Sequence, residues 1–284
     1  MAYEPNAKRR KTKSFMEKNL VEMWHPTAKW CYYVAFVLKE KLPRELGVVP
    51  YLLRIIRNML PSSKLNCLIV VDNQINNTGA IKLAKMLPCS KLVELYLHNN
   101  QIGPSADGPM KLAEMLPSSK LTFLWIRNNQ IGDAGAIKLA EALPHSKLTE
   151  LHLVDNQIAD DGAIKLAKAL PHSKLTLLRL GCNEITDAGA IALAEALPGS
   201  KLTRLVLSCN QITDAGAIKL AEALSSSELL CLNLDSNQIT DAGAIALAEA
   251  LPGSKLTHLY LYGNQITDAG KAILNNIVKD NIKF

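Results

Sequence analysis

Aromatic residues make up only 5% of this 284-residue chain, although hydrophobic residues make up 48%. A core must therefore be built from aliphatic side chains, and the apolar content excludes disorder for most of the chain. No run of about 18 uncharged apolar residues is found, so we expect no membrane span. The start at Met1 lacks an apolar run behind a short basic segment, so no signal peptide is expected.

Sequence motifs for catalysis are also missing. The chain contains no phosphate-cradling loop, zinc-protease motif or nucleophile elbow. Its six cysteines are scattered without zinc-site spacing, which favours free thiols in a reducing compartment. We therefore expect no catalytic, cofactor-binding or metal-binding residues, no enzymatic activity and a cytoplasmic, monomeric protein.

Positive charge is concentrated at the N-terminal end. Residues 1–63 hold 12 Lys/Arg and 5 Glu, whereas the remainder holds 20 Lys/Arg and 21 Asp/Glu. A near-neutral body does not support a nucleic-acid groove, so we expect a protein partner and no nucleic acid. The basic run from Lys8 to Lys13 has three interpretations: a nuclear-import signal, an anchor to an anionic surface or a solvated tail.

An internal repeat dominates the rest of the chain. A Lys-Leu or Glu-Leu pair begins each of eight units, which are spaced by 27 residues except that the second unit has 29. The units begin at Lys64, Lys91, Lys120, Lys147, Lys174, Lys201, Glu228 and Lys255.

Each unit predicts one strand and one helix. In the fourth unit, alternating leucines predict a short strand, at Leu148, Leu151 and Leu153. Asp160 is expected to cap a helix, because aspartate is a favoured N-cap residue. Ala163–Leu170 is a run of strong helix formers, and Pro171 is expected to end the helix.

Such a unit cannot bury its apolar face alone, but stacked units can. Parallel strands stack at about 4.8 Å, whereas helices are roughly 10 Å across. The stack must bend with its strands inside. We therefore predict an α/β solenoid of horseshoe shape, with a concave parallel sheet and convex helices.

An asparagine occupies the same place at the strand exit of every unit. Because core residues flank it, we expect it to be buried and to bond backbone groups of the adjoining loops. The prediction is a stacked hydrogen-bond ladder, made by Asn73, Asn100, Asn129, Asn156, Asn183, Asn210, Asn237 and Asn264.

The pattern L-x-x-L-x-L-x-x-N-x-I, followed by G-A-I-x-L-A-x-A-L, resembles leucine-rich repeats of the ribonuclease-inhibitor type. It is similar to the repeats of NOD-like receptors and Ran GTPase-activating protein. Ile158 completes the strand half in the fourth unit, and Gly162, Ala163, Leu166, Ala167 and Leu170 match the helix half. The resemblance implies the fold; it does not choose among the different functions of these families.

The ends read as caps. We predict a basic tail without fixed structure at 1–26, a helical N-terminal cap at 27–63, eight repeats at 64–269 and a C-terminal cap helix at 270–284. The end of the N-terminal cap echoes the repeat, so it looks like a degenerate unit. Within it, Leu42–Leu46 resembles the opening of an F-box, although Pro50 interrupts the following helix.

Differences between the units indicate a binding surface. Counted from the first strand leucine, the third, fifth, seventh and eighth places change almost every time, whereas the exposed helix positions hardly change. The third, fifth and seventh places alternate away from the core leucines and line the concave side. The predicted protein-binding residues are Glu94, Tyr96, His98, Phe123, Trp125, Arg127, Glu150, His152, Asp155, Arg179, Arg204, Asp235, His258, Tyr260 and Tyr262.

Aromatic residues and arginine are favoured contact anchors, so the expected centre is Tyr96, Phe123 and Trp125, with Tyr260 and Tyr262 second. The other function class is an adaptor or regulator of an enzyme, either a ubiquitin ligase or a GTPase, and a host-directed protein is a further analogy. The longer loop of the second unit, Gly103–Pro109, is either functional or a tolerated insertion.

Overall fold

A computed structural model describes residues 33–36, 65–103, 105–277 and 282–283. Within them, ten strands form one parallel sheet whose order follows the chain from β1 to β10. The strands are β1 (Tyr33–Phe36), β2 (Cys67–Val70), β3 (Glu94–Tyr96), β4 (Phe123–Trp125), β5 (Glu150–His152), β6 (Leu177–Arg179), β7 (Arg204–Val206), β8 (Cys231–Asn233), β9 (His258–Tyr260) and β10 (Ile282–Lys283).

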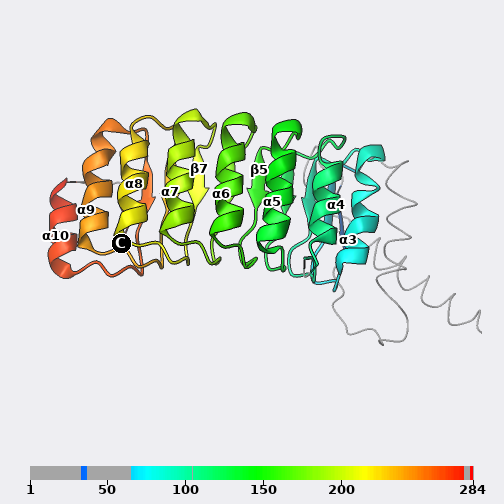
Figure 1. Cartoon of the computed structure of the whole chain (residues 1–284), viewed down its shortest axis with the longest axis horizontal. Coiled ribbons are helices and arrows are strands. Elements are labelled where there is room, and N and C mark those ends of the chain that lie inside the picture. The colour runs from blue at the N-terminus through cyan, green and yellow to red at the C-terminus, as the bar shows by residue number, and fades with distance from the viewer. Residues whose placement is uncertain (1–32, 37–64, 104, 278–281, 284) are drawn as a thin grey trace, which may run out of the picture.

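A helix follows each strand from β2 to β9, and these helices stand side by side in front of the sheet (Figure 1). They are α3 (Asn77–Ala84), α4 (Asp107–Met115), α5 (Gly132–Ala142), α6 (Asp160–Ala169), α7 (Asp187–Ala196), α8 (Asp214–Leu224), α9 (Asp241–Ala250) and α10 (Asp268–Ile277). Short 3₁₀ turns follow several of them: η2 (Leu87–Cys89), η3 (Leu143–His145), η4 (Leu170–His172), η5 (Leu197–Gly199) and η6 (Leu251–Gly253). The predicted fold class is confirmed.

The two ends differ from the helical caps that we expected. Inside 27–63 the described residues, Tyr33–Phe36, form a strand in register with β2, so the expectation of helix is wrong for these four residues. At the other end, α10 is the expected helix, but Ile282–Lys283 pairs with β9. The sheet is therefore extended by one strand beyond the repeats at each end. The remainder of 1–63 lies outside the described residues.

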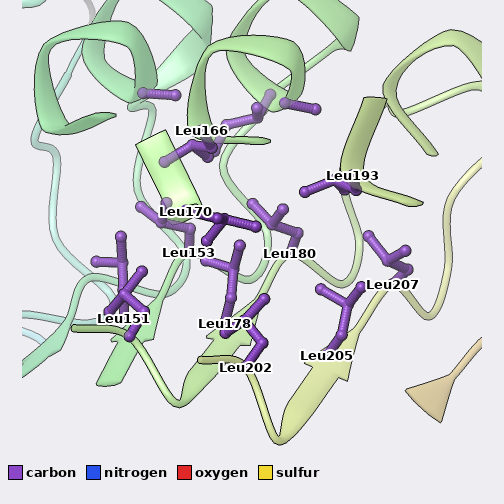
Figure 2. Close-up of a cluster of buried hydrophobic side chains, with 14 of the residues drawn as sticks. Leu151, Leu153, Leu166, Leu170, Leu178, Leu180, Leu193, Leu202, Leu205 and Leu207 are labelled. Atoms are coloured by element: carbon purple, nitrogen blue, oxygen red, sulfur yellow. The ribbon is translucent and has the colours of Figure 1, made fainter. Parts of the chain in front are cut away.

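Aliphatic side chains fill the space between sheet and helices. Leu151, Leu178 and Leu205 are paired on consecutive strands, and all are fully buried. Leucines from the helices, such as Leu166 and Leu193, meet them from the other side (Figure 2). Because each layer repeats along the array, one continuous core joins all eight units. Helices are wider than the strand spacing, so the sheet lies on the inside of the curve.

The asparagine ladder is confirmed. The Asn183 side chain donates to the carbonyl oxygens of Leu180 in its own unit and Leu153 in the preceding unit, each at 3.0 Å. Its Oδ1 accepts from the backbone N–H groups of Asn156 and Ile158 at 3.1 and 3.0 Å. The carboxamide therefore joins two units at the point where both strands end, and it satisfies backbone groups that would otherwise be buried without partners.

A second ladder runs along the first turns of the helices, and it corrects the expected role of aspartate. Asp160 does not cap its own helix: it is the first residue of α6, and the N-cap is Ala159. Its Oδ1 instead accepts from the N–H groups of Thr186 and Gly189 in the next unit, both at 2.9 Å, while Oδ2 accepts from the Thr186 hydroxyl at 2.6 Å. The carboxylate thus supplies acceptors at the N-terminus of its neighbour's helix.

The same arrangement recurs through most of the array. Asp133, Asp187, Asp214 and Asp241 each accept from the N–H group 26 residues later. At the first units, Asn77 accepts from the Gly103 N–H at 2.8 Å. We call this set the aspartate ladder. The α-helix ends before Pro171 as expected: α6 stops at Ala169, and Pro171 lies in the short 3₁₀ turn η4 that follows.

The inserted loop of the second unit interrupts the aspartate ladder. Ala106, the N-cap of α4, has a left-handed backbone with φ of 58° and makes no side-chain capping bond. The Asp107 carboxylate accepts from the Ser105 hydroxyl at 2.8 Å, within its own loop. Among the described residues, no carboxylate bond joins α4 to the N-terminus of α5. The junction between the second and third units is held instead by the core, the pairing of β3 with β4, the asparagine ladder and a bond from the Asn128 side chain to Asn99 at 3.0 Å.

Replacing Asp187 by alanine tests the aspartate ladder. The N–H groups of Thr213 and Gly216, at the N-terminus of α8, and the Thr213 hydroxyl would lose their acceptor. We expect the free energy of unfolding to fall by about 1–3 kcal/mol, because hydrogen bonds to a charged group are lost at a partly buried site. Urea unfolding followed by circular dichroism measures this. The control is Glu195→Ala on the exposed face of α7, and equal midpoints for the two variants would contradict the ladder's role.

Glycine near the start of each helix is explained by close packing. A Cβ atom at Gly189 would lie 2.7 Å from Asp160 Oδ1 and 2.7 Å from Ile185 Cγ2. Helix propensity alone predicts that Gly189→Ala stabilises α7 by about 1 kcal/mol. We expect the opposite, a loss of about 1–3 kcal/mol, because the added methyl overpacks the site.

The same urea experiment distinguishes these outcomes. Gly253→Ala is the control, because the nearest atom to an added Cβ there is 3.9 Å away. That variant should be neutral or slightly stabilised. A Gly189→Ala protein with an unchanged or raised midpoint would show that the contact is not tight.

Candidate protein-binding surface

The strand register brings the variable places of all eight units into two continuous rows. Along the fifth place, Tyr96 pairs with Trp125, Trp125 with His152 and His152 with Arg179. The row then passes through Val206 and Asn233 to Tyr260. The third place gives a parallel row from Cys67 through Glu94, Phe123, Glu150, Leu177, Arg204 and Cys231 to His258. We call the surface formed by the third, fifth and seventh places the inner wall.

The aromatic residues of the second to fourth units form one connected group. The ring of Tyr96 lies 4.9 Å from that of Phe123 and 5.6 Å from that of Trp125, measured between centroids. His98 lies 5.2 Å from Trp125, and His152 stacks on Trp125 at 4.8 Å. We call these five residues the aromatic cluster. The expected proximity of Tyr96, Phe123 and Trp125 is confirmed.

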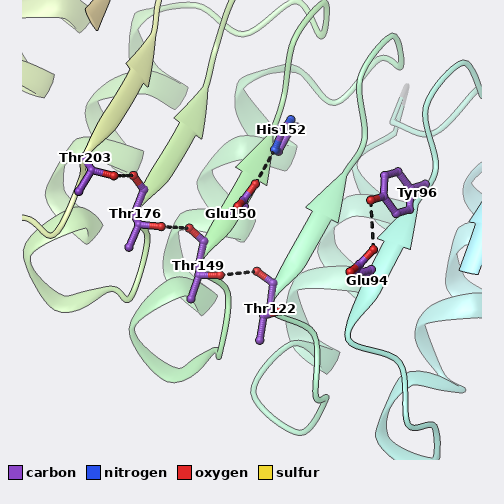
Figure 3. A network of polar contacts seen from close by, with 8 residues as sticks. All are labelled: Glu94, Tyr96, Thr122, Thr149, Glu150, His152, Thr176 and Thr203. Atoms are coloured by element: carbon purple, nitrogen blue, oxygen red, sulfur yellow. Dashed lines mark hydrogen bonds and ion pairs between the residues drawn. The ribbon is translucent and has the colours of Figure 1, made fainter. Parts of the chain in front are cut away.

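His152 was predicted to contact the partner, but its side chain is buried. Only 4% of it is exposed, because Phe123 and Trp125 both pack on its ring. Its Nε2 lies 3.3 Å from Glu150 Oε2, as Figure 3 shows, and Tyr96 donates to Glu94 at 3.1 Å in the same way. His152 therefore supports the other rings, whereas Tyr96, Phe123 and Trp125 are partly exposed.

Burial shifts the titration of the cluster. Desolvation lowers the pKa of His98, and the charge of Arg127 lowers it further while Asp72 opposes this. The pKa of His152 is also lowered, first by desolvation and then by Arg179 and Arg204, against the bond to Glu150. Burial and the Glu94 carboxylate raise the pKa of Tyr96. At neutral pH the cluster therefore presents uncharged rings.

Several polar atoms of this region are buried without a hydrogen-bond partner. They are Trp125 Nε1, His98 Nδ1, His152 Nδ1 and Arg179 Nε. The indole and guanidinium nitrogens are donors in any protonation state. Leaving a buried donor unpaired costs about 1–3 kcal/mol, so these atoms lower the stability of this region.

The far end of the wall holds the second predicted group. His258 and Tyr260 stack with centroids 6.3 Å apart, and Tyr262 is 69% exposed. Asp235 is occupied structurally, because its carboxylate accepts from the Tyr262 N–H at 2.7 Å and from the Asn233 side chain at 3.1 Å. Three strands separate this group from the aromatic cluster, so the two are separate patches of one wall.

The eighth place follows a backbone rule. Every unit has a left-handed residue there, with φ between 49° and 71°. Asn, Asp and Gly tolerate this region best, which accounts for Asp72, Asn99, Asn128, Asp155 and Gly263. The variation that we attributed to binding at this place is therefore limited by the backbone. Asp155 is exposed beside the wall rather than on its strands.

Sequence reasoning by residue type missed part of the wall. Ile69, Leu177, Val206, Cys231 and Asn233 stand in the same two rows, and only their place in the unit could have identified them. Arg127 and Arg204 are exposed, and Arg179 and Glu150 are partly buried, all on the wall as expected.

The described residues hold no group of three or more His, Cys, Asp or Glu side chains arranged for a metal ion. Cys182 and Cys209 are free thiols, and burial together with the hydrogen bond that the Cys182 thiol donates to Cys209 raises the pKa of Cys182 to about 11. No helix in this part of the chain has the length and apolar character to cross a bilayer. The basic run Lys8–Lys13 and the F-box-like Leu42–Leu46 lie outside the described residues.

Comparison of the fold with solved structures gives an internalin (inlF) of Listeria monocytogenes, with a TM-score of 0.51 and 25% identity over 78% of this chain. The chain spans about half of that protein's length, 54%. Leiomodin-1 actin-binding site 2 is similar with a TM-score of 0.40, 23% identity and coverage of 44% of this chain and 79% of that one. A plant ice-binding protein is similar with a TM-score of 0.41 and 17% identity, and the match covers 66% of this chain and 53% of that one.

None of the curated proteins compared with the chain matches its sequence. A family model described as leucine-rich repeat does match, in seven stretches that together make up more than half of the chain. They are residues 62–84, 118–140, 145–167, 172–194, 200–221, 225–248 and 254–270. With the strand–helix units and the asparagine ladder, this match shows that the chain belongs to the leucine-rich-repeat family.

Proposed function

We propose that this protein binds a partner protein on its inner wall and has no catalytic activity of its own. Leucine-rich repeats generally mediate protein–protein interaction, which is the coarse statement that the family supports. The observation that carries the finer proposal is the aromatic cluster, where three partly exposed rings of two adjacent strands lie in contact.

The distribution of aromatic residues supports this choice. All five aromatics between residues 64 and 270 stand on the inner wall, at Tyr96, Phe123, Trp125, Tyr260 and Tyr262. The core needs none of them, because leucine, isoleucine and alanine fill it. Large rings that are neither required for folding nor hidden by it suit the centre of an interface, where aromatic residues contribute most of the energy.

The chemistry of the wall argues against catalysis. The pair of His152 and Glu150 resembles a base with its carboxylate, but the imidazole is covered by Phe123 and Trp125. A substrate could not reach it without displacing both rings. We also propose the ribonuclease-inhibitor type of repeat, because a full α-helix follows the strand in each unit.

Truncating two rings tests the proposal. Affinity capture with the intact chain first isolates the partner, and the affinity of the purified pair is then measured by calorimetry. Trp125→Ala combined with Tyr96→Ala should weaken binding by roughly 2 kcal/mol or more, because central aromatic anchors carry such energies.

The control is Ile218→Ala with Ile273→Ala, which truncates exposed hydrophobic side chains on the convex helices α8 and α10. Circular dichroism should show that both double variants are folded. A partner that binds the Trp125/Tyr96 variant as tightly as the control would place the interface elsewhere.

A further inference from the structure

The charged residues of the repeats are divided sharply between the two sides. All three arginines between residues 64 and 277, Arg127, Arg179 and Arg204, stand on the inner wall. No lysine occupies a third, fifth or seventh place in any unit. Lysines instead lie on the helices and loops, where several pair with glutamates, as Lys219 does with Glu222 at 2.7 Å.

The acidic groups of the wall already have partners within it. Glu94 accepts from Tyr96, Glu150 contacts His152, and Asp235 accepts from the Tyr262 backbone. The three arginines have none: among the described residues, no carboxylate lies within salt-bridge distance of Arg127, Arg179 or Arg204. The wall therefore has positively charged hydrogen-bond donors, the three guanidinium groups, that are not paired with a carboxylate.

Arg179 and Arg204 are the two arginines that lie on adjacent strands. They stand on the adjacent strands β6 and β7, flanked in their rows by His152, Val206, Leu177 and Cys231, none of which is an acid. Both guanidinium groups act on the same two side chains, His152 and Cys231, so their charges share one region of the wall.

We propose that the middle of the inner wall binds an acidic, extended segment of the partner protein, with an aromatic or large apolar side chain against Trp125 and carboxylates on Arg179 and Arg204. Planar guanidinium groups match carboxylates in bidentate geometry, which explains arginine in place of lysine. This inference rests on the proposed function and specifies the chemistry of the ligand.

The strand spacing sets the spacing of the groups in the segment. Arg179 and Arg204 are two and three strands from Trp125. At about 4.8 Å per strand and about 3.3 Å per residue of extended chain, these separations place the carboxylates about three and about four residues beyond the apolar anchor.

A single-stranded nucleic acid would also offer negative charge and stacking bases. The wall is less suited to it, because Glu94, Glu150 and the neighbouring Asp155 would face a continuous phosphate backbone. We therefore commit to the acidic peptide and use an oligonucleotide as a competing outcome of the test.

Fluorescence anisotropy with labelled synthetic ligands tests the inference on the full chain. The first peptide carries tryptophan followed by aspartates at the stated spacing; the second has lysines in place of the aspartates; the third has alanine in place of tryptophan; the fourth ligand is oligothymidine. We expect the first peptide to bind most tightly and its affinity to fall with salt, since screening weakens exposed charge pairs.

Arg179→Gln with Arg204→Gln should weaken the first peptide by about tenfold or more, because two charge-assisted contacts are removed. The matched control is Lys165→Gln with Lys219→Gln, which removes the same charge from the helices and should leave binding unchanged. Circular dichroism of both variants checks the fold.

Equal binding of the lysine peptide or of oligothymidine, equal loss in the two double variants, or no binding of the first peptide would overturn the inference. The proposed function has a separate test. A captured partner that depends on Trp125 but not on Arg179 and Arg204 would leave the protein-binding role intact and remove the acidic segment.

Discussion

The asparagine carboxamide at each strand exit is the contact on which the array depends. A leucine-rich unit ends its strand inside the core, where backbone groups lose water and need partners. Asn183 meets this need for its own unit and for the preceding one with a single side chain. Because the same side chain is used eight times, the strand positions of every unit follow from those of its neighbour. The rows of the inner wall keep the same register from strand to strand for this reason.

The aspartate ladder performs the corresponding task on the helix side. It differs in that the carboxylate bonds to the following unit. The residue that it meets there is glycine, because a side chain would collide with the carboxylate oxygen. Aspartate, threonine and glycine of the repeated Thr-Asp-Ala-Gly sequence are therefore one device spread over two units. Side chains at the third and fifth places of the inner wall belong to neither ladder. Those places are therefore free to differ from unit to unit.

Much of the fold could be predicted from the sequence, because a period of 27 residues, broken only by the 29-residue second unit, fixes both the strand leucines and the asparagine. The period could not show whether Asp160 serves its own helix or the next, since both are consistent with the same spacing. It could not show that His152 is covered, because burial there depends on which rings stand on the neighbouring strand. The terminal strands were missed because the sequence departs from the repeat there, and their pairing is set by the open edges of the sheet.

The interruption at Asp107 has a thermodynamic consequence for recognition. In a linear array each unit is coupled only to its neighbours, so the array opens most readily where that coupling is weakest. Among the described residues no carboxylate joins α4 to the N-terminus of α5, and on the opposite side the rings of Tyr96 and Trp125 cross the same junction. A ligand that contacts both rings would hold the second and third units together. Ligand binding would then stabilise this junction. The first two units would be coupled more strongly to the rest of the solenoid in the bound state than in the free state.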